Sequence, residues 1–243
     1  MQPKICYNSS MSTLITIGII VLSVLIMSFL TLVPGTFTLF NHYAQGRFSK
    51  KHASDLSFFF ILGAEITASC VFLSTFIIVA VFIADTQNTD TSILTWIFII
   101  IMIILSLTSL LFYFRPGKGT ELFISRKTAR AIDRQARNAK NRSDAFVLGA
   151  LCGTPELFFT VPLFIITSCE ILQLSSTHPM SSMLSYIYIV APVIPLIICR
   201  WQFFHGHNLA DIQRSRVHDK HFTRLILSIS YLIIAIILLQ FRI

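Results

Sequence analysis

Six long, nearly uncharged apolar blocks dominate this sequence of 243 residues. They cover residues 14–40, 56–84, 93–114, 146–172, 183–204 and 225–241. About 20 consecutive apolar residues in a helix are enough to cross the roughly 30 Å hydrocarbon core of a bilayer. The blocks lack the alternation of apolar and polar residues that is typical of an outer-membrane barrel. We therefore predict an all-α polytopic membrane protein with six transmembrane helices.

The composition supports this class of protein and excludes others. Hydrophobic residues make up 54% of the chain and charged residues only 12%, whereas about 25% of the residues in a soluble domain are charged. The chain has five cysteines, without a C-x-x-C pair or a metal-ligand spacing. We therefore predict no disulfide framework, no metal site and no bound cofactor.

Lysine and arginine are distributed very unevenly between the loops. Sixteen of the 19 lie in loops 41–55, 115–145 and 205–224. Arg200 lies near the end of the fifth block that leads into the last of these loops, and the remaining two lie close to the termini. Because cytoplasmic loops of membrane proteins are enriched in basic residues, we expect these loops in the cytoplasm and both termini outside. The net charge of +8 then reflects topology, and we expect no nucleic-acid partner.

The blocks divide into a first half, 1–114, and a second half, 146–243, joined by a basic linker, 115–145. Each half holds three spans, and an odd number of spans places the two halves in opposite orientations across the membrane. Inverted repeats with interrupted helices are typical of transporters, whose substrate site lies near the bilayer midplane at the repeat interface. We therefore predict a 3+3 inverted repeat.

Proline interrupts the first block of each half at a matching depth. The motifs are Pro34-Gly35 in the first block and Thr154-Pro155 in the fourth. Proline removes a backbone donor and clashes with the preceding turn, and the freed backbone groups need a partner in protein, water or a solute. We interpret both motifs as breaks that form a site; the alternative is a pair of kinks that only shape the bundle. Pro192 and Pro195 in the fifth block are interpreted as a packing kink.

Three glutamates lie inside apolar blocks, where ionisable side chains are costly and usually functional. Glu65 lies in the middle third of the second block, Glu156 follows the break in the fourth, and Glu170 lies near the outer surface, where we expect it to reach water. A lone glutamate in hydrocarbon favours its protonated form, so it can bind and release a proton as its surroundings change. We predict proton or cation binding at Glu65 and Glu156; the alternative is a neutral glutamate hydrogen-bonded to a neighbouring helix.

The linker and the histidines carry weaker signals. Apolar residues of the linker repeat at helical spacing, namely Leu122, Ala129, Ile132, Ala136 and Ala139. We predict an amphipathic helix on the inner membrane surface, held by anionic lipid, with partner binding as the alternative. Six of the seven histidines lie in the basic loops without a completing carboxylate or cysteine, and we interpret them as polar loop residues.

Short motifs around the two breaks resemble those of the lysine exporter (LysE) superfamily of six-helix membrane transporters. The first patch is Pro34-Gly35, Gly46-Arg47 and Leu62-Gly63-Ala64, and the second is Gly149, Thr154-Pro155-Glu156, Phe158-Phe159 and Pro162. The spacing from Pro34-Gly35 to Gly46-Arg47 is shorter than in the family, and Glu156 stands where the family has lysine. The resemblance implies a transporter with its site at the breaks, and the glutamate implies a cationic or proton-coupled substrate.

These features predict a membrane transporter, an exporter of a small cationic solute such as an amino acid or a metal ion, with proton coupling. The predicted substrate- or proton-binding residues are Glu65, Glu156, Pro34, Gly35, Thr154 and Pro155. We expect a bacterial cytoplasmic membrane as the location, with the lipid bilayer and the solute as partners; a homodimer is compatible with these features.

Two other functions are weaker interpretations of the same sequence. One is a non-transporting membrane scaffold that recruits a cytoplasmic partner through its basic loops. The other is a membrane-embedded enzyme. No serine-nucleophile motif, P-loop, dinucleotide fingerprint or H-E-x-x-H motif occurs in the sequence, so we predict that the protein is not an enzyme.

Overall fold

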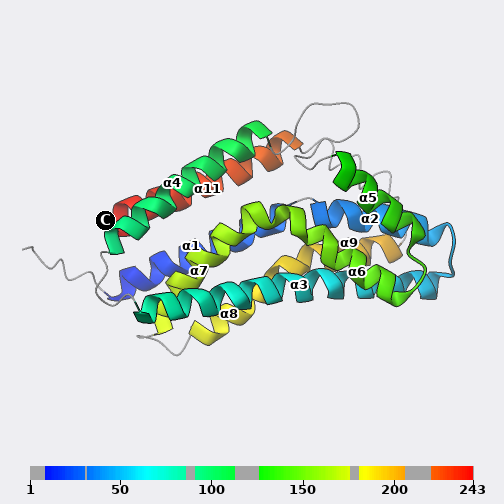
Figure 1. Cartoon of the computed structure of the whole chain (residues 1–243), viewed down its shortest axis with the longest axis horizontal. Coiled ribbons are helices and arrows are strands. Elements are labelled where there is room, and N and C mark those ends of the chain that lie inside the picture. Colours follow the sequence, from blue (N-terminus) through cyan, green and yellow to red (C-terminus); the bar gives the residue numbers. More distant parts are fainter. Residues whose placement is uncertain are drawn as a thin grey trace, which may run out of the picture.

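The computed structural model describes residues 9–30, 32–85, 91–112, 126–175, 181–205 and 220–242. Within these ranges every regular element is an α-helix or a short 3-10 turn, which confirms the predicted all-α class. Most of the helices run roughly along one long axis (Figure 1). The beginning of α1 and the end of α11 lie at one end of the molecule, and α5 lies toward the other.

The first half of the chain contains α1 (Ser9–Phe29), α2 (Leu32–Gln45), α3 (Lys50–Asp85) and α4 (Thr91–Phe112), and α5 (Arg126–Asn138) follows them. The second half contains α6 (Arg142–Gly153), η1 (Thr154–Glu156), α7 (Leu157–Ser175), α8 (Ser181–Val190), η2 (Ala191–Val193), α9 (Ile194–Phe204) and α11 (Lys220–Arg242).

Five segments are long and apolar enough to cross a membrane, and they correspond to five of the six predicted spans. They are Thr13–Ala44, Lys50–Ile83, Arg142–Leu174, Met183–Gln202 and Phe222–Gln240. The third predicted span, 93–114, corresponds to α4, whose apolar stretch Thr95–Leu111 is shorter. Large apolar side chains stand exposed along α3, α4, α8, α9 and α11. Such extensive apolar surface is what helices in contact with lipid require.

Three buried apolar clusters hold the helices together. One joins α1, α4, α7 and α11 around Met102 and Tyr231. A second joins α2, α3, α5, α6 and α9 around Phe60. A third joins α1, α3, α7 and α8 around Phe72 and Tyr188. The second cluster lies on one side of the interruptions in the helices and the third lies on the other, so the interruptions fall between two packed layers.

The crossing of α3 and α6 brings two backbones into contact. A Cβ atom added at Gly63 would overlap the carbonyl oxygen of Phe146, and one added at Gly149 would overlap the carbonyl oxygen of Phe60. The contact is reciprocal, because each glycine meets the residue three positions before the other glycine. Small residues permit such close helix approach in membranes, and here only glycine fits.

Polar groups pair α4 with α11. Ser106 donates to the carbonyl oxygen of Ser228 at 2.9 Å, and the two hydroxyl oxygens lie 3.0 Å apart. Arg224 donates to the carbonyl oxygen of Leu110 in the last turn of α4, where a cation also matches the negative end of the helix dipole. These bonds satisfy polar groups that would be costly to leave unpaired in lipid.

The predicted amphipathic helix of the linker is present as α5, but its apolar face does not rest on lipid. Ala136 and Ala139 are buried in the cluster formed with α2, α3, α6 and α9, and Ile132 packs against it. Tyr43 on α2 donates a hydrogen bond to Asp133 at 3.1 Å. The apolar face is therefore covered by protein, because α2 and α6 supply enough apolar surface to bury it. Leu122 lies outside the described residues.

The fourth span begins earlier than predicted, inside the segment assigned to the linker. α6 starts at Arg142, whereas the apolar block begins at residue 146. Asp144 accepts hydrogen bonds from the backbone N–H groups of Lys140 and Asn141 at 3.1 and 3.2 Å. A carboxylate in the first turn satisfies free donors and matches the helix dipole, so polar residues can start this helix before the apolar block.

Candidate functional site: a cavity at three helix breaks

The first break separates α1 from α2 and lies earlier than the Pro34-Gly35 motif. The helix ends at Phe29, Leu30 N–H donates to the carbonyl oxygen of Met27 at 3.3 Å, and α2 begins at Leu32. Pro34 therefore lies in the first turn of α2, a position that tolerates proline. A continuous helix would need an N–H at residue 34 to bind the carbonyl of Leu30, so the proline forces the break four residues upstream.

The second break is the 3-10 turn η1 between α6 and α7. Pro155 lies inside this turn and has no N–H to offer to the carbonyl of Leu151. The hydroxyl of Thr154 donates to that carbonyl at 2.8 Å, as does its backbone N–H. The turn therefore keeps its backbone groups satisfied while it changes the path of the helix.

The third break lies in the fifth apolar block, where the sequence predicted no more than a packing kink. The 3-10 turn η2 contains Pro192 and separates α8 from α9, and Pro195 follows in the first turn of α9. Both prolines line the same cavity as the other two breaks. Sequence reasoning missed them as site residues, although two prolines three positions apart in one apolar block were a usable signal.

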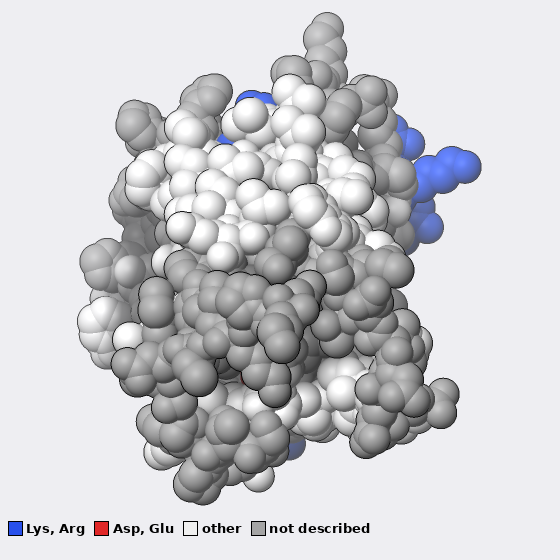
Figure 2. Space-filling model, turned by 90° about the vertical axis from the view of Figure 1, so that its left-hand side faces the viewer, with Lys and Arg blue, Asp and Glu red and all other residues white. Residues whose placement is uncertain are grey.

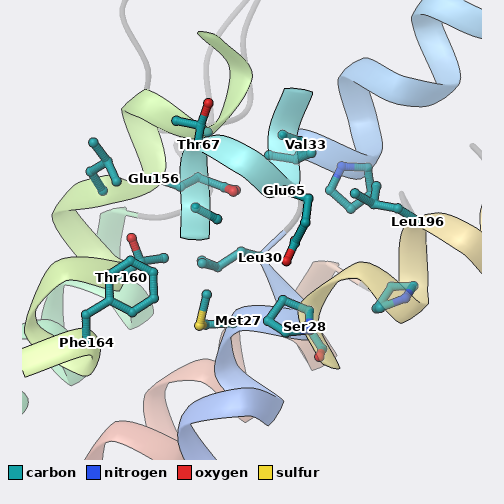
Figure 3. A pocket seen from close by; sticks show the side chains of 17 residues that line it. Met27, Ser28, Leu30, Val33, Glu65, Thr67, Glu156, Thr160, Phe164 and Leu196 are labelled. Carbon is teal, nitrogen blue, oxygen red and sulfur yellow. The ribbon is translucent and has the colours of Figure 1, made fainter. Parts of the chain in front are cut away.

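The three breaks and the middle of α3 surround a partly open cavity of about 90 Å³, hereafter the central cavity. Figure 3 shows its walls, with side chains from all four regions turned toward one space. Its lining residues are Met27, Ser28, Leu30, Val33, Pro34, Ala64, Glu65, Thr67, Ala68, Gly153, Glu156, Leu157, Thr160, Phe164, Pro192, Pro195 and Leu196. The lining is mostly apolar, with a few polar groups among it, as is common in small-molecule sites.

Two carboxylates line the central cavity from different elements. Glu65 comes from α3, is half-buried and accepts a hydrogen bond from Ser69 at 3.3 Å. Glu156 comes from η1 and is only 4% exposed. No lysine, arginine or histidine is among the residues that line the cavity. The cavity therefore presents acidic groups in an apolar surrounding, which suits a cation or protons.

Three hydroxyl side chains complete the polar part of the wall. Ser28 and Thr67 donate to carbonyl oxygens of their own helices, those of Val24 and Gly63, at 2.9 and 3.0 Å. Their hydroxyl protons are therefore occupied, and their oxygens keep lone pairs that can accept hydrogen bonds. Thr160 is 7% exposed and lies one turn beyond Glu156. The polar wall is thus dominated by acceptors.

The structure brings together half of the residues predicted as a site. Glu65, Glu156 and Pro34 line the central cavity. The other three predicted residues do not line it: Thr154 and Pro155 lie in the second break, and Gly35 lies in the first turn of α2, after the first break. Thr154 is exposed, with its hydroxyl bound to its own helix. The direction in which each of these three residues faces depends on how the broken helices pack.

Glu170 differs most from its prediction. It was expected to reach water, but it is only 2% exposed and accepts a hydrogen bond from Thr16 on α1 at 2.8 Å. The packing of α1 over α7 buries it. No group of three or more histidine, cysteine, aspartate or glutamate side chains in the described parts of the chain could hold a metal ion.

Comparison of the chain with protein-family models, with curated proteins and with solved structures gives no match. The resemblance to the LysE superfamily therefore stays a prediction. Function has to follow from the geometry of the central cavity.

Proposed function

We propose that this protein is a membrane transporter that exports a small cationic solute, such as an amino acid or a metal ion, in exchange for protons. The observation that carries this proposal is the pair Glu65 and Glu156, which come from the two halves of the chain and line one cavity. Helix breaks near the middle of the bundle with ionisable groups beside them are typical of carriers.

Exchange follows from the chemistry of the two carboxylates. In an apolar cavity an ionised carboxylate needs a positive partner, which is either its own proton or a bound cation. Loss of protons therefore prepares the cavity for the cationic solute, and release of the solute prepares it for protons. The three breaks supply the flexible points about which the bundle exposes the cavity to one side and then to the other.

The proposed architecture is a 3+3 inverted repeat of six spans with both termini outside. Basic side chains at the α2–α5 end support this orientation, since Lys50, Lys51, Lys127, Arg130 and Arg134 are all exposed. Figure 2 looks at the opposite end, where the described surface in view carries almost no charged atoms except at its margin. The α2–α5 end is therefore the cytoplasmic one in this proposal.

The test is flux through the purified protein in lipid vesicles. The vesicles are loaded with a pH dye, a proton gradient is imposed, and a panel of amino acids and divalent cations is offered one at a time. We expect solute movement coupled to a dye response. Glu156→Gln and Glu65→Gln should each lower coupled flux by about tenfold or more, the loss expected when roughly 1.4 kcal/mol or more of cation binding is removed.

Asp55→Asn is the matched control for this experiment. Asp55 is an exposed carboxylate near the start of α3 that does not line the central cavity, so its neutralisation should leave coupled flux unchanged. Normal coupled flux in a folded Glu65→Gln/Glu156→Gln double variant would overturn the proposal.

The scaffold is the second candidate, and the exposed basic face of α5 is the observation in its favour. A scaffold has no need of a cavity and should pack Glu65 and Glu156 against neighbouring helices. The central cavity lined by both residues supports transport instead. Absence of flux for every solute of the panel would shift the weight to the scaffold.

A further inference from the structure

We infer that a proton relay runs from Glu170 to Glu65 in the central cavity through Thr167, Tyr188 and Ser69. The inference rests on the proposed function and deepens it, because it names the route by which protons reach the cavity from the end at which α1 begins. In the orientation proposed above, that end is the outer one.

The outer terminus of the relay is the buried pair Glu170 and Thr16. Each is 2% exposed, and the hydroxyl of Thr16 donates to Glu170 Oε2 at 2.8 Å. α7 packs against α1, α3, α4, α8 and α11. Cys169 on α7 itself is the titratable group next to Glu170. The neighbouring helices supply Tyr188 on α8, Tyr231 on α11, which donates to the carbonyl oxygen of Phe159, and Glu65 on α3 further inward, and α1 supplies the Thr16 hydroxyl. No lysine, arginine or histidine occurs in the described parts of α1, α4, α7 and α8 or in the second half of α3.

The middle of the relay consists of two fully buried hydroxyls. Thr167 is 0% exposed and Tyr188 is 1% exposed. The two hydroxyls lie close enough to interact with each other, and neither has a partner of good hydrogen-bond geometry among the described residues. Such groups are rare, because buried polar atoms are almost always paired. A hydroxyl both donates and accepts, so this pair can pass a proton. Thr167 precedes Glu170 by three residues, a spacing that places them on one face of α7.

The inner part of the relay crosses a small void next to the central cavity. The void measures about 10 Å³ and is lined by both Ser69 and Tyr188. This volume is at the lower limit for one water molecule, and the relay requires a water there to join the two hydroxyls. Ser69 in turn donates to Glu65 Oε1 at 3.3 Å. Met27 lines both the void and the central cavity, so the two spaces adjoin.

Three aromatic rings pack together at the level of Tyr188. The ring centroids of Phe72 and Phe164 lie 5.6 Å apart, and that of Tyr188 lies 5.0 Å from Phe72 and 6.0 Å from Phe164. Rings in contact leave no room for a solute between them in this arrangement. A proton passes by exchange along hydroxyls, so this layer separates the route of protons from the route of the solute.

The transfer is balanced at every step. Glu170 gives its proton to the hydroxyl of Thr167 as that hydroxyl gives its own proton to Tyr188. Tyr188 passes a proton through the water to Ser69, and Ser69 passes one to the carboxylate of Glu65. Each hydroxyl ends neutral, Glu65 gains a proton, and Glu170 is left ionised until it takes up a proton from the outer side, a step that requires water to reach this buried side chain.

Infrared spectroscopy of the protein in lipid vesicles tests the relay without any solute. The carboxylic-acid band of Glu65 is identified by its loss in Glu65→Gln, and its shift after transfer to D2O measures how fast protons reach this residue. We expect Glu170→Gln and Tyr188→Phe to slow that exchange by about tenfold or more. Tyr186→Phe is the matched control, because Tyr186 lies on the same helix but is 71% exposed.

Several results would overturn the relay. One is an unchanged exchange rate in Glu170→Gln or in folded Tyr188→Phe, which removes only one hydroxyl. Another is the absence of a Glu65 carboxylic-acid band at every pH, since a relay terminus has to carry the proton. The flux assay separates this result from the proposed function: slowed exchange without flux keeps the relay and rejects the transporter, and flux with unchanged exchange rejects the relay alone.

Discussion

The crossing of α3 with α6 and the central cavity beside it are neighbouring regions with opposite packing. At Gly63 and Gly149 the two backbones touch, because both residues lack a Cβ atom. Two positions after Gly63, the same helix presents Glu65 to open space between interrupted helices. Glycine, which has no side chain, therefore permits two membrane helices to pack backbone against backbone. Proline, which has no backbone N–H, interrupts the helices and leaves a cavity between them.

The two regions also depend on each other. α3 is continuous from Lys50 to Asp85, while the three segments around the cavity are interrupted. A glutamate in a membrane keeps a defined position only when its helix is held by its neighbours. The glycine crossing holds α3 against α6, and it thereby holds one carboxylate in place beside helices that can change their path.

The largest expected effect comes from adding a side chain at the α3–α6 crossing. In Gly149→Ala the new methyl group overlaps the carbonyl oxygen of Phe60, so we expect a loss of about 3 kcal/mol or more in the free energy of unfolding. Denaturant titration of the protein in micelles measures it. Gly18→Ala is the control, because a Cβ atom there meets nothing within 4 Å. Equal stability of Gly149→Ala and the wild type would show that the helices do not cross as described.

The next largest effect comes from removing the proline that causes the break between α1 and α2, beside the central cavity. Pro34→Ala restores the N–H that can bind the carbonyl of Leu30, so α1 and α2 can form one helix and narrow the central cavity. We expect coupled flux to fall by about tenfold, with a free energy of unfolding that is unchanged or higher. Pro162→Ala provides the comparison, because Pro162 lies inside α7 and does not line the cavity. Equal loss of flux in both variants would contradict the special role of the break.

A smaller effect is expected at the second break, where the hydroxyl of Thr154 binds a backbone carbonyl that Pro155 leaves without its usual donor. Thr154→Val removes the hydrogen bond to the carbonyl of Leu151, which should cost about 1 kcal/mol of unfolding free energy. Flux should not change, because Thr154 does not line the central cavity. Loss of flux at unchanged stability would instead restore the sequence prediction that Thr154 belongs to the site. Thermal unfolding and vesicle flux on the same preparation decide between these results.

The smallest effect is expected from the ion pair between the starts of α3 and α6. Arg142 at the start of α6 lies 2.9 Å from Asp55 on α3, and both side chains are exposed. Asp55→Asn should lower the free energy of unfolding by about 0–1 kcal/mol, and by less in high salt. A loss as large as that of Gly149→Ala would mean that charge, and not backbone contact, holds α3 to α6.

Sequence reasoning succeeded where a signal lies within a few turns of one helix. Glu65 and Glu156 stand out because a charge in an apolar block is unusual wherever the block packs. Pro34 and Pro155 identify broken helices because the missing N–H acts on the preceding turn. Glu170 shows the limit of such reasoning, because its burial depends on Thr16, which is far away in sequence and adjacent only after folding.

Local chemistry was therefore enough to define the apolar helices and the two segments, around Pro34 and Pro155, in which the backbone breaks. Each of these depends on hydrogen bonds and side chains within a few residues. Three-dimensional packing was needed to bring η2 to the same cavity as the other breaks, to cover the apolar face of α5 with protein, and to bury Glu170. Helix propensity and hydropathy hold no information on which faces of distant helices meet, since that choice is made by shape and contact between segments far apart in the chain.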